Sequence, residues 1–422
     1  NGGGPVHINL ITTYSRDFSV KELPHVKVMR RFQAWDELPV LPEGRIGIYV
    51  GSHTHFSEKQ NRAIDRFCAT YDAVVICDHT SGYYGKYKLL PTLVQLQSDI
   101  TSPFPPLDLM VHIGEISAAS FNDTIPAKEV WRVSEDGELR DPFKKLTTVF
   151  QMSEEMFFLH YGKDGCNRHV LIDECRELFG EIYEQIPELP FCNIWTAMQL
   201  SSRLPKGALF HMGVSNTRRC WNMFQLPESV ESACNVGCCG IDGCVSTLVG
   251  ASLVNPDRLC YVVVGDLTFF YDLNSLGNHH IGTNLRVMLV NNGRGTEFRL
   301  GIHHCNVFGD DADKYMAAAG HFGNKSPLLV KHYAEDLGFH YLSATTKEEF
   351  MTALSNFTNP QLSDHSMILE VFTDSKDESE ALYLMSHIQS DAKGMVRSKL
   401  KDAVRNVAGE KGINAIKKIL KK

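Results

Sequence analysis

The sequence has 422 residues, of which 43% are hydrophobic, 22% charged and 10% aromatic. This length exceeds that of most single cores, so two domains are expected. The composition excludes a largely disordered chain, and no run of 18 apolar residues predicts a membrane-spanning helix. The net charge is −8, yet residues 391–422 hold ten Lys or Arg and only three Asp or Glu. The acidic remainder argues against general nucleic-acid binding, so any basic function is expected in the tail.

The first residues of the chain have the pattern expected at the end of a preceding domain. Residues 1–5 (NGGGP) include no initiator Met, which predicts a processed or truncated product. Residues 6–10 have the pattern of a short strand after a Gly/Pro turn. The polar, Pro-containing sequence up to about residue 44 is interpreted as a linker.

The next region alternates apolar strands with helical spacing, which predicts a parallel sheet covered by helices. A helix is expected over 57–70. The expected strands are 45–51, 73–77, 107–113 and 129–133. No G-x-G-x-x-G follows these strands, so no dinucleotide site is assigned.

A helical stretch over about 146–190 is expected to lead into a second alternating region. Its apolar strands are predicted at 208–213, 260–265, 286–291 and 367–372. Such continuous apolar runs are typical of strands buried on both faces. The predicted fold class is therefore α/β with two doubly wound parallel-sheet domains. The predicted divisions are a remnant of a preceding domain at 1–10, a linker and central domain at 11–165, a second domain at 166–390 and a tail at 391–422.

The tail has apolar residues at helical spacing with lysines between them, and a break near Gly409 and Gly412 predicts two short helices. We expect an oligomer- or body-docking helix, with a membrane-surface helix as the alternative. Twelve cysteines without a C-x-x-C pair predict reduced, mostly buried thiols rather than zinc ligands. A cytoplasmic location follows from this expectation, with peripheral membrane contact as the variant.

Two short motifs carry the chemistry. GDLT at 265–268 and NNGRG at 291–295 each follow a predicted buried strand. Asp266 and Asn292 would present a carboxylate and an amide oxygen from neighbouring strand ends, a donor set suited to Mg²⁺ bound to a diphosphate. The glycines allow close backbone approach, and a helix starting near Asp272 is expected to point its positive end at the anion.

In this context the motifs resemble those of thiamin-diphosphate-dependent enzymes of the pyruvate-decarboxylase superfamily. GIDG (240–243), GDLTFFYDLNSL (265–276) and NNGRGTEF (291–298) further resemble the SEPHCHC synthases of menaquinone biosynthesis. GPVHIN (4–9) is similar to the end of that family's pyrimidine-binding domain. The resemblance extends over residues 4 to about 375.

The resemblance implies a role for each matching position. Mg²⁺ would be bound by the side chains of Asp266 and Asn292 and by the carbonyl of Arg294. Ile241 would be the apolar wedge that holds the cofactor bent. Other residues expected to contact the cofactor are Gly265, Leu267, Thr268 and Gly295. The residues expected to line the substrate pocket are Ser215, Arg219, Glu297 and Phe298.

Some positions depart from the family pattern. Asn235 is followed by Val236 where the family has an Arg, and 117–121 (SAASF) lack the family's Lys-Arg pair. Glu297 stands where the family has an aliphatic residue. Fewer cations and an added carboxylate predict a less anionic acceptor. We therefore expect a 2-oxo-acid decarboxylase or carboligase, with SEPHCHC synthase itself and a non-catalytic subunit of the same fold as alternatives.

In the superfamily, the glutamate that activates the cofactor lies on the pyrimidine-binding domain, and sites form between subunits. The resemblance thus implies thiamin diphosphate and Mg²⁺ as cofactors, a 2-oxo acid donor, a small-molecule acceptor, and a homodimer or homotetramer. The pyrimidine-binding domain is expected in cis before truncation or on another chain. The chain alone is expected to be inactive.

Overall fold

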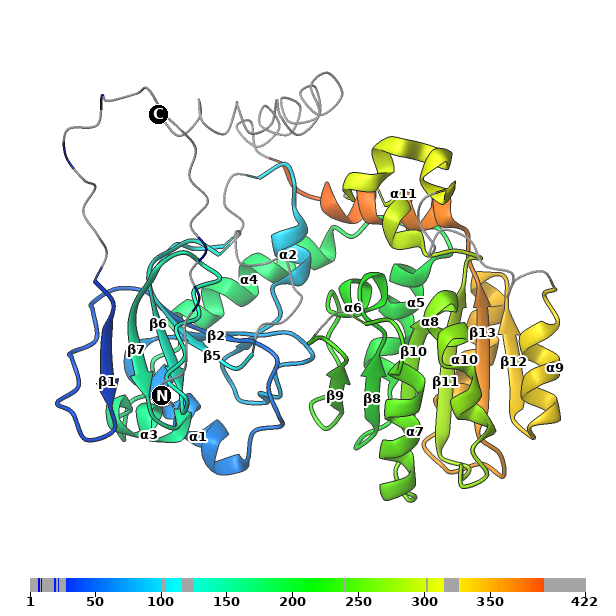
Figure 1. Cartoon of the computed structure of the whole chain (residues 1–422), viewed down its shortest axis with the longest axis horizontal. Coiled ribbons are helices and arrows are strands. Elements are labelled where there is room, and N and C mark those ends of the chain that lie inside the picture. The colour runs from blue at the N-terminus through cyan, green and yellow to red at the C-terminus, as the bar shows by residue number, and fades with distance from the viewer. Residues whose placement is uncertain are drawn as a thin grey trace.

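The computed structural model describes residues 28–100, 104–115, 125–237, 240–300, 303–314 and 326–390, with four isolated positions before residue 28. Two sheets form the centres of two α/β bodies that lie next to each other (Figure 1). Every pairing between the described strands is parallel. The predicted fold class is confirmed. The tail at 391–422 and most of the predicted strand at 6–10 lie outside the described residues.

The first sheet has the strand order β1-β7-β6-β5-β2-β3-β4. Its strands are β1 (Arg30–Gln33), β2 (Ile46–Val50), β3 (Val74–Ile76), β4 (Lys88–Leu89), β5 (Leu107–Ile113), β6 (Ala127–Ser134) and β7 (Leu146–Gln151). The order reverses between β2 and β5, where such sheets usually bind ligands. Here the backbones of Ser52 and Glu115 bond to each other at 2.8 and 3.1 Å across this point. A Cβ on Gly51 would lie 1.8 Å from the Glu115 carbonyl oxygen, so the chain's own backbone occupies the crevice.

Aromatic packing holds the first sheet to helices α1 (Glu58–Tyr71) and α3 (Glu154–Tyr161). The ring of Phe157 lies 4.9 Å from that of Phe150 on β7 and 6.2 Å from that of Phe67 on α1. Helix α1 begins with a capping box, in which Ser57 and Gln60 bond each other's backbone N–H groups. The short helix α2 (Thr92–Leu96) and the long helix α4 (Val170–Glu184) complete this body.

The structure corrects two predictions for the first body. β1 lies within the stretch interpreted as a linker, and β7 occupies the start of the stretch predicted as helical over 146–190. β1 reads RRFQ, and three of its four residues are polar, which concealed this edge strand in the sequence. β7 reads LTTVFQ, whose buried threonine at Thr148 breaks the apolar run expected of a central strand. β4, with two residues, was also missed.

The second sheet has the order β12-β13-β11-β10-β8-β9, which places β10 and β11 side by side at its centre. Its strands are β8 (Leu209–Met212), β9 (Glu231–Cys234), β10 (Cys260–Gly265), β11 (Leu285–Asn291), β12 (His340–Ala344) and β13 (Met367–Phe372). The four apolar strands were predicted. The edge strands β9 (ESAC) and β12 (HYLSA) were not, since both carry polar, partly exposed side chains.

Alternate residues of the central strands pack on opposite faces of the second sheet, as a doubly wound fold requires. Val262 and Val264 join one hydrophobic cluster with residues of α7 and α9, and Tyr261 and Val263 join the other with residues of α5 and α10. Helix α11 lies across the carboxyl ends of the strands (Figure 1). The helices are α5 (Asn193–Leu200), α6 (Asn216–Trp221), α7 (Cys244–Val254), α8 (Asp266–Tyr271), α9 (Leu329–Asp336), α10 (Lys347–Phe357) and α11 (Ser375–Ser386).

Near Asp272, where a helix is expected to start, the structure has only a short 3-10 helix. α8 begins directly at Asp266 and ends at Tyr271, and a 3-10 turn (Leu273–Gly277) follows. Asp272 connects the end of α8 to the first turn of α7, because its Oδ2 accepts a 2.6 Å hydrogen bond from the backbone N–H of Ser246.

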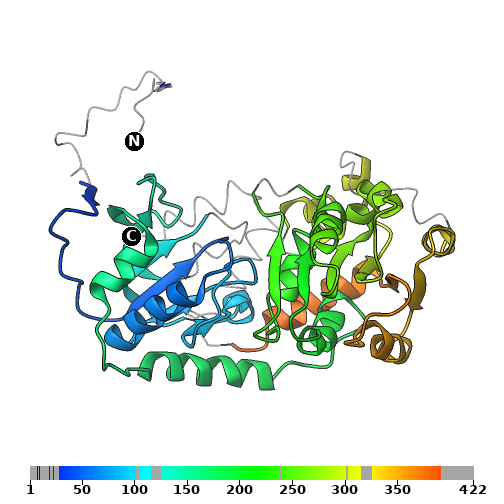
Figure 2. The same ribbon diagram turned by 90° about the horizontal axis from the view of Figure 1, so that it is seen from below.

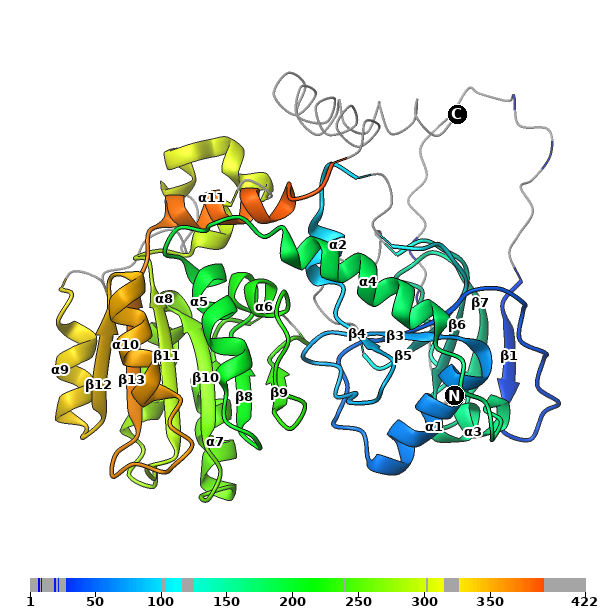
Figure 3. The ribbon, with the colours of Figure 1, turned by 180° about the vertical axis from the view of Figure 1, so that it is seen from behind.

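The two bodies are joined by α4, which runs from one to the other (Figures 2 and 3), and by a buried polar contact. Arg218 of α6 lies 3.4 Å from Asp78, which follows β3, and the two side chains are only 8% and 6% exposed. The neighbouring His79 has Nε2 at 2.8 Å from the Phe224 carbonyl oxygen and 3.2 Å from that of Trp221. Because both partners are acceptors, Nε2 must carry the proton. Burial holds the pKa of His79 down at about 4, so the imidazole is neutral.

None of the helices in the described ranges combines the length and hydrophobicity needed to cross a bilayer.

Candidate functional site

The two sequence motifs lie at neighbouring strand ends. β10 and β11 pair along their length, with Gly265 opposite Val290. Asp266 follows β10 as the first residue of α8, and Asn292 follows β11. Adjacent parallel strands lie roughly 4.8 Å apart. The carboxylate and the amide therefore start from adjacent strand ends at one edge of the sheet, as the motif interpretation requires.

Asp266 is almost fully buried, with 2% of its surface exposed. Its Oδ1 accepts a 2.7 Å hydrogen bond from the backbone N–H of Leu267. Thr268, one position further on, is also buried. A Cβ built on Gly265 would meet no atom within 4 Å, so the glycine borders open space next to this carboxylate. A phosphate group could occupy that space.

The loop after β11 turns through a glycine. Gly293 has φ +82°, a conformation that favours glycine. Asn292 is half-buried, and its Oδ1 lies 3.4 Å from the backbone N of Arg294, which makes a long hydrogen bond. Gly295 precedes the 3-10 helix η4 (Thr296–Arg299). Carboxylate, amide and carbonyl oxygens together are a donor set that fits Mg²⁺ and a diphosphate.

A buried glutamate supports the tip of β11, and sequence reasoning missed it. Glu370 on β13 is 1% exposed. It accepts hydrogen bonds from Asn291 Nδ2 at 2.7 Å and from the Tyr341 hydroxyl at 2.8 Å. Burial raises its pKa, and the charge of Asp266 adds to that effect. The available signal was a charged residue inside an otherwise apolar strand, MILEVF.

A second buried glutamate, Glu378 of α11, was also missed. It accepts hydrogen bonds from the backbone N–H of Asn193 at 3.0 Å and from the Thr373 hydroxyl at 2.9 Å. Burial raises its pKa to about 7, with smaller contributions from the charges of Asp377 and Asp266. In sequence it looked like any acidic residue in a first helical turn.

The GIDG loop precedes α7. Ile241 is half-buried there, and Gly243 has φ +80° at the start of the helix. The Ser246–Asp272 hydrogen bond ties this first turn of α7 to the end of α8. The loop carrying the predicted apolar wedge is thereby fixed to the segment that begins with Asp266.

Ser215, one of the predicted substrate residues, is conformationally strained. It follows β8 and precedes α6 with φ +60° and ψ −119°, a region rarely adopted by residues with a Cβ. Such strain persists only where the surrounding structure imposes it, and it concentrates at functional sites. The sequence carries no signal for it.

Two other predicted substrate residues pair with each other. Arg219 Nη2 lies 2.6 Å from Glu297 Oε1, and Nη1 lies 3.0 Å from Oε2. The side chains are 22% and 23% exposed. Although burial by itself lowers the pKa of Arg219, the hydrogen bonds and charge of Glu297 raise it overall. The guanidinium end expected to face a substrate carboxylate is thus occupied by a carboxylate of the chain.

Phe298, the remaining residue predicted to line the substrate pocket, is half-buried, with its ring edge-on to His303 at 5.1 Å. Asn235 and Val236 lie just after β9, where Val236 is buried. Residues 117–121 lie outside the described residues.

Buried thiols were predicted for the cysteine group at 234–244, and only two of its four members can be described. Cys244 is buried and Cys234 half-buried, whereas positions 238 and 239 are not described. Within the described ranges no group of three or more His, Cys, Asp or Glu side chains is placed to hold a metal ion. An ion at Asp266 and Asn292 would therefore need further ligands from the backbone or from a bound diphosphate.

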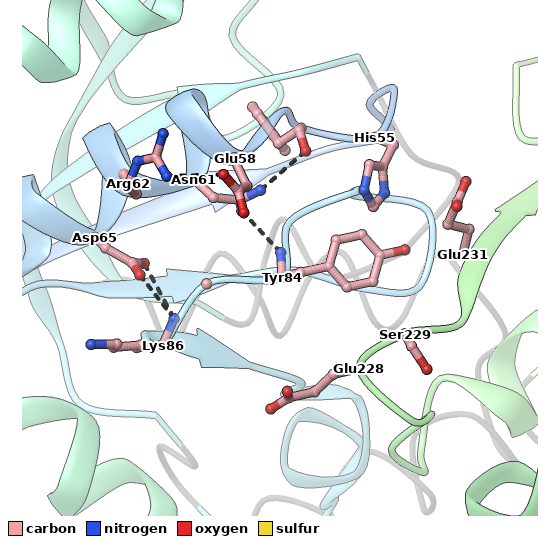
Figure 4. Close-up of a pocket in the computed structure, with 12 residues that line it drawn as sticks. His55, Glu58, Asn61, Arg62, Asp65, Tyr84, Lys86, Glu228, Ser229 and Glu231 are labelled. Carbon is pink, nitrogen blue, oxygen red and sulfur yellow. Dashed lines mark hydrogen bonds and ion pairs between the residues drawn. The ribbon is translucent and has the colours of Figure 1, made fainter. Parts of the chain in front are cut away.

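A pocket of about 450 Å³ lies between the two bodies, away from these motifs (Figure 4). The ring of Tyr84 extends across it, and the Tyr84 hydroxyl donates to the carbonyl of Val230 at 3.2 Å. Glu231, at the other side, is the first residue of β9. The pocket thus lies at the amino edge of the second sheet, opposite the edge that holds Asp266.

The chain is similar to known enzymes over most of its length. It is 28% identical over 410 residues to the 2-succinyl-5-enolpyruvyl-6-hydroxy-3-cyclohexene-1-carboxylate (SEPHCHC) synthase of Bacteroides thetaiotaomicron, an alignment covering 90% of this chain and 70% of that protein. The enzyme of the same name from Flavobacterium johnsoniae is 29% identical over 404 residues, or 88% of this chain and 69% of that protein. No protein-family model matches.

The chain is thus similar to the SEPHCHC synthases over about nine-tenths of its length. A shorter alignment agrees: the SEPHCHC synthase of Christiangramia forsetii is 33% identical over 199 residues, which are 47% of this chain and 33% of that protein. The resemblance inferred from the motifs is confirmed. Of the three functions considered, these names favour one of the alternatives, SEPHCHC synthase, over the generic decarboxylase or carboligase.

Proposed function

We propose that the chain forms the central and diphosphate-binding parts of a thiamin-diphosphate-dependent carboligase of the SEPHCHC-synthase type. Such an enzyme decarboxylates a 2-oxo acid and joins the remaining fragment to an acceptor. The observation that carries the proposal is the placement of Asp266 and Asn292 after the paired strands β10 and β11. The similarity to SEPHCHC synthases over 90% of the chain supports it independently.

The residues present fit the cofactor. Asp266 and Asn292 would hold Mg²⁺ through side-chain oxygens, and the open space beside Gly265 would receive a phosphate. Glu370 would fix the tip of β11 through Asn291. Thiamin diphosphate, when bound, supplies the carbon nucleophile and the electron sink for decarboxylation.

The remaining residues would act on the substrates. Ile241 is proposed to support the bent cofactor from below, as its place in the GIDG loop suggests. Ser215, held strained at the end of β8, would present its hydroxyl to a substrate oxygen. Phe298 would form an apolar wall. The activating glutamate is proposed to come from a pyrimidine-binding domain, in the same protein or in a partner subunit.

Calorimetric titration of the full-length protein with thiamin diphosphate, with and without Mg²⁺, tests the proposal. We expect Mg²⁺-dependent binding that Asp266→Ala reduces by two orders of magnitude or more, about 3 kcal/mol. Asp257→Ala is the matched control, because Asp257 is exposed near the opposite end of the same strand. Equal affinity in the two variants would disprove the assigned site.

The reaction itself is tested by carbon dioxide release from a panel of 2-oxo acids, followed by product analysis with isochorismate as acceptor. Formation of SEPHCHC would establish the specific function. Decarboxylation with other acceptors only would leave the carboligase class but reject the specific reaction.

A further inference from the structure

The Arg219–Glu297 ion pair spans the candidate site. Arg219 belongs to α6, which follows β8, and Glu297 belongs to η4, which follows the loop after β11. β10 lies between β8 and β11 in the sheet. The pair therefore connects the segments on either side of β10, the strand that Asp266 follows.

Both oxygens of Glu297 bind the two terminal nitrogens of Arg219, at 2.6 and 3.0 Å. Asn216 Oδ1 lies a further 3.5 Å from Nη1. This two-bond geometry occupies a guanidinium edge that matches a carboxylate. It also leaves the pair with no net charge, so an incoming carboxylate would meet the negative charge of Glu297 as well as the positive charge of Arg219.

Arg218, the residue before Arg219, does not supply the positive charge that Glu297 neutralises on Arg219. Arg218 points the other way, toward Asp78 of the first body, at 3.4 Å. It is 7% exposed. Both arginines of α6 are thus neutralised by carboxylates of the chain.

We propose that Glu297 is a specificity-determining residue: by neutralising Arg219 it selects an acceptor that presents a neutral hydrogen-bonding group, such as a hydroxyl, rather than a carboxylate, to this side of the pocket. The inference rests on the proposed carboligase function and narrows its acceptor class. The Nε–H of Arg219 lies on a different edge of the guanidinium from the two nitrogens that bind Glu297, and it suits a neutral oxygen acceptor.

The test compares two small aldehydes that differ at one group, succinate semialdehyde with a carboxylate and 4-hydroxybutanal with a hydroxymethyl group, neither of which is a 2-oxo acid. The full-length protein is supplied with Mg²⁺, thiamin diphosphate and the 2-oxo acid that it decarboxylates fastest. We expect the native protein to favour 4-hydroxybutanal, and Glu297→Gln to shift the ratio of kcat/KM values at least about tenfold toward succinate semialdehyde. Glu231→Gln is the matched control, since Glu231 pairs with Arg258 at 2.9 Å at the opposite edge of the sheet.

A binding measurement separates this inference from the proposed function. Malonate is titrated into the protein without cofactor. Glu297→Gln should bind it about tenfold more tightly than the native protein, and the additional change Arg219→Gln should remove the gain. If native protein and Glu297→Gln bind malonate equally and share one aldehyde preference, the inference is wrong even where decarboxylation proceeds. If no 2-oxo acid is decarboxylated, the proposed function is wrong. Malonate binding then still shows whether Glu297 prevents Arg219 from binding a carboxylate.

Discussion

Asn291, the last residue of β11, donates a 2.7 Å hydrogen bond to Glu370 on the neighbouring strand β13. Tyr341 of β12 donates to the other oxygen of the same carboxylate. One buried side chain thus holds three strands together, next to the position proposed for the metal ion.

Glu370→Ala removes the acceptor for both donors. Because Asn291 is 6% exposed, its amide cannot turn to bulk water, and we expect a loss of about 2–4 kcal/mol in the free energy of unfolding. Urea denaturation measures it. Tyr341→Phe is the control, since it removes only the donor to Glu370 Oε2 and keeps the Asn291 hydrogen bond to Oε1, at a cost of about 1–2 kcal/mol. Equal losses in the two variants would contradict the bridging role.

The pH dependence of stability should report Glu378. Its pKa is raised to about 7, so between pH 4.5 and 7 the folded protein holds this proton while the unfolded chain releases it. Stability from this group is therefore present at low pH and declines as the pH rises through that window, by at most about 3 kcal/mol.

Glu378→Gln keeps an oxygen for Asn193 and Thr373 and cannot ionise. We expect the difference in unfolding free energy between native protein and variant to change between pH 5 and pH 8 in favour of the variant, in Mg²⁺-free buffer. A difference that stays constant over this range would show that Glu378 does not titrate there.

The contact between the two bodies predicts a strong single-site effect. Arg218→Met leaves Asp78 buried without its cation, and we expect a loss of about 3 kcal/mol. In an Asp78→Asn background the same change should cost at least about 1 kcal/mol less, because no charge is left unpaired. Denaturation of the four proteins in this double-mutant cycle measures the coupling. Additive losses in unfolding free energy would show that the 3.4 Å contact contributes no coupling energy to stability.

The strained backbone of Ser215 predicts that glycine is preferred there for stability. Ser215→Ala retains the Cβ and the strain, whereas Ser215→Gly removes both, and the two variants lack the same hydroxyl. We expect Ser215→Gly to be about 1–2 kcal/mol more stable than Ser215→Ala. Thermal unfolding compares them, and equal midpoints would mean that φ +60° costs little at this position.

The central strands of both sheets could be predicted because burial on both faces requires nearly continuous apolar sequence, as in Cys260–Gly265. Edge strands such as Arg30–Gln33 and His340–Ala344 face water on one side, and their polar residues resemble loops. Sequence pattern therefore locates the middle of a parallel sheet better than its margins.

Some residues of the candidate site could likewise be predicted from the sequence, and others could not. Asp266 and Asn292 could be located because they follow predictable strands at a recognisable spacing. Glu370 and Glu378 could not, since a buried acid differs from a surface acid only through partners that are far apart in sequence, such as Asn193 and Thr373. The pairing of Arg219 with Glu297 was likewise hidden, although each residue had been singled out.

The two ion pairs of helix α6 connect the first body to the candidate site. Arg218 and Arg219 are consecutive, yet one is anchored to Asp78 in the first body and the other to the loop after β11. A rotation of one body against the other would therefore act on two adjacent residues in the middle of this six-residue helix. The position of the Arg219–Glu297 pair in the candidate site is thereby linked to the angle between the bodies, so a change at Asp78 is expected to alter the position of Glu297 without any direct contact.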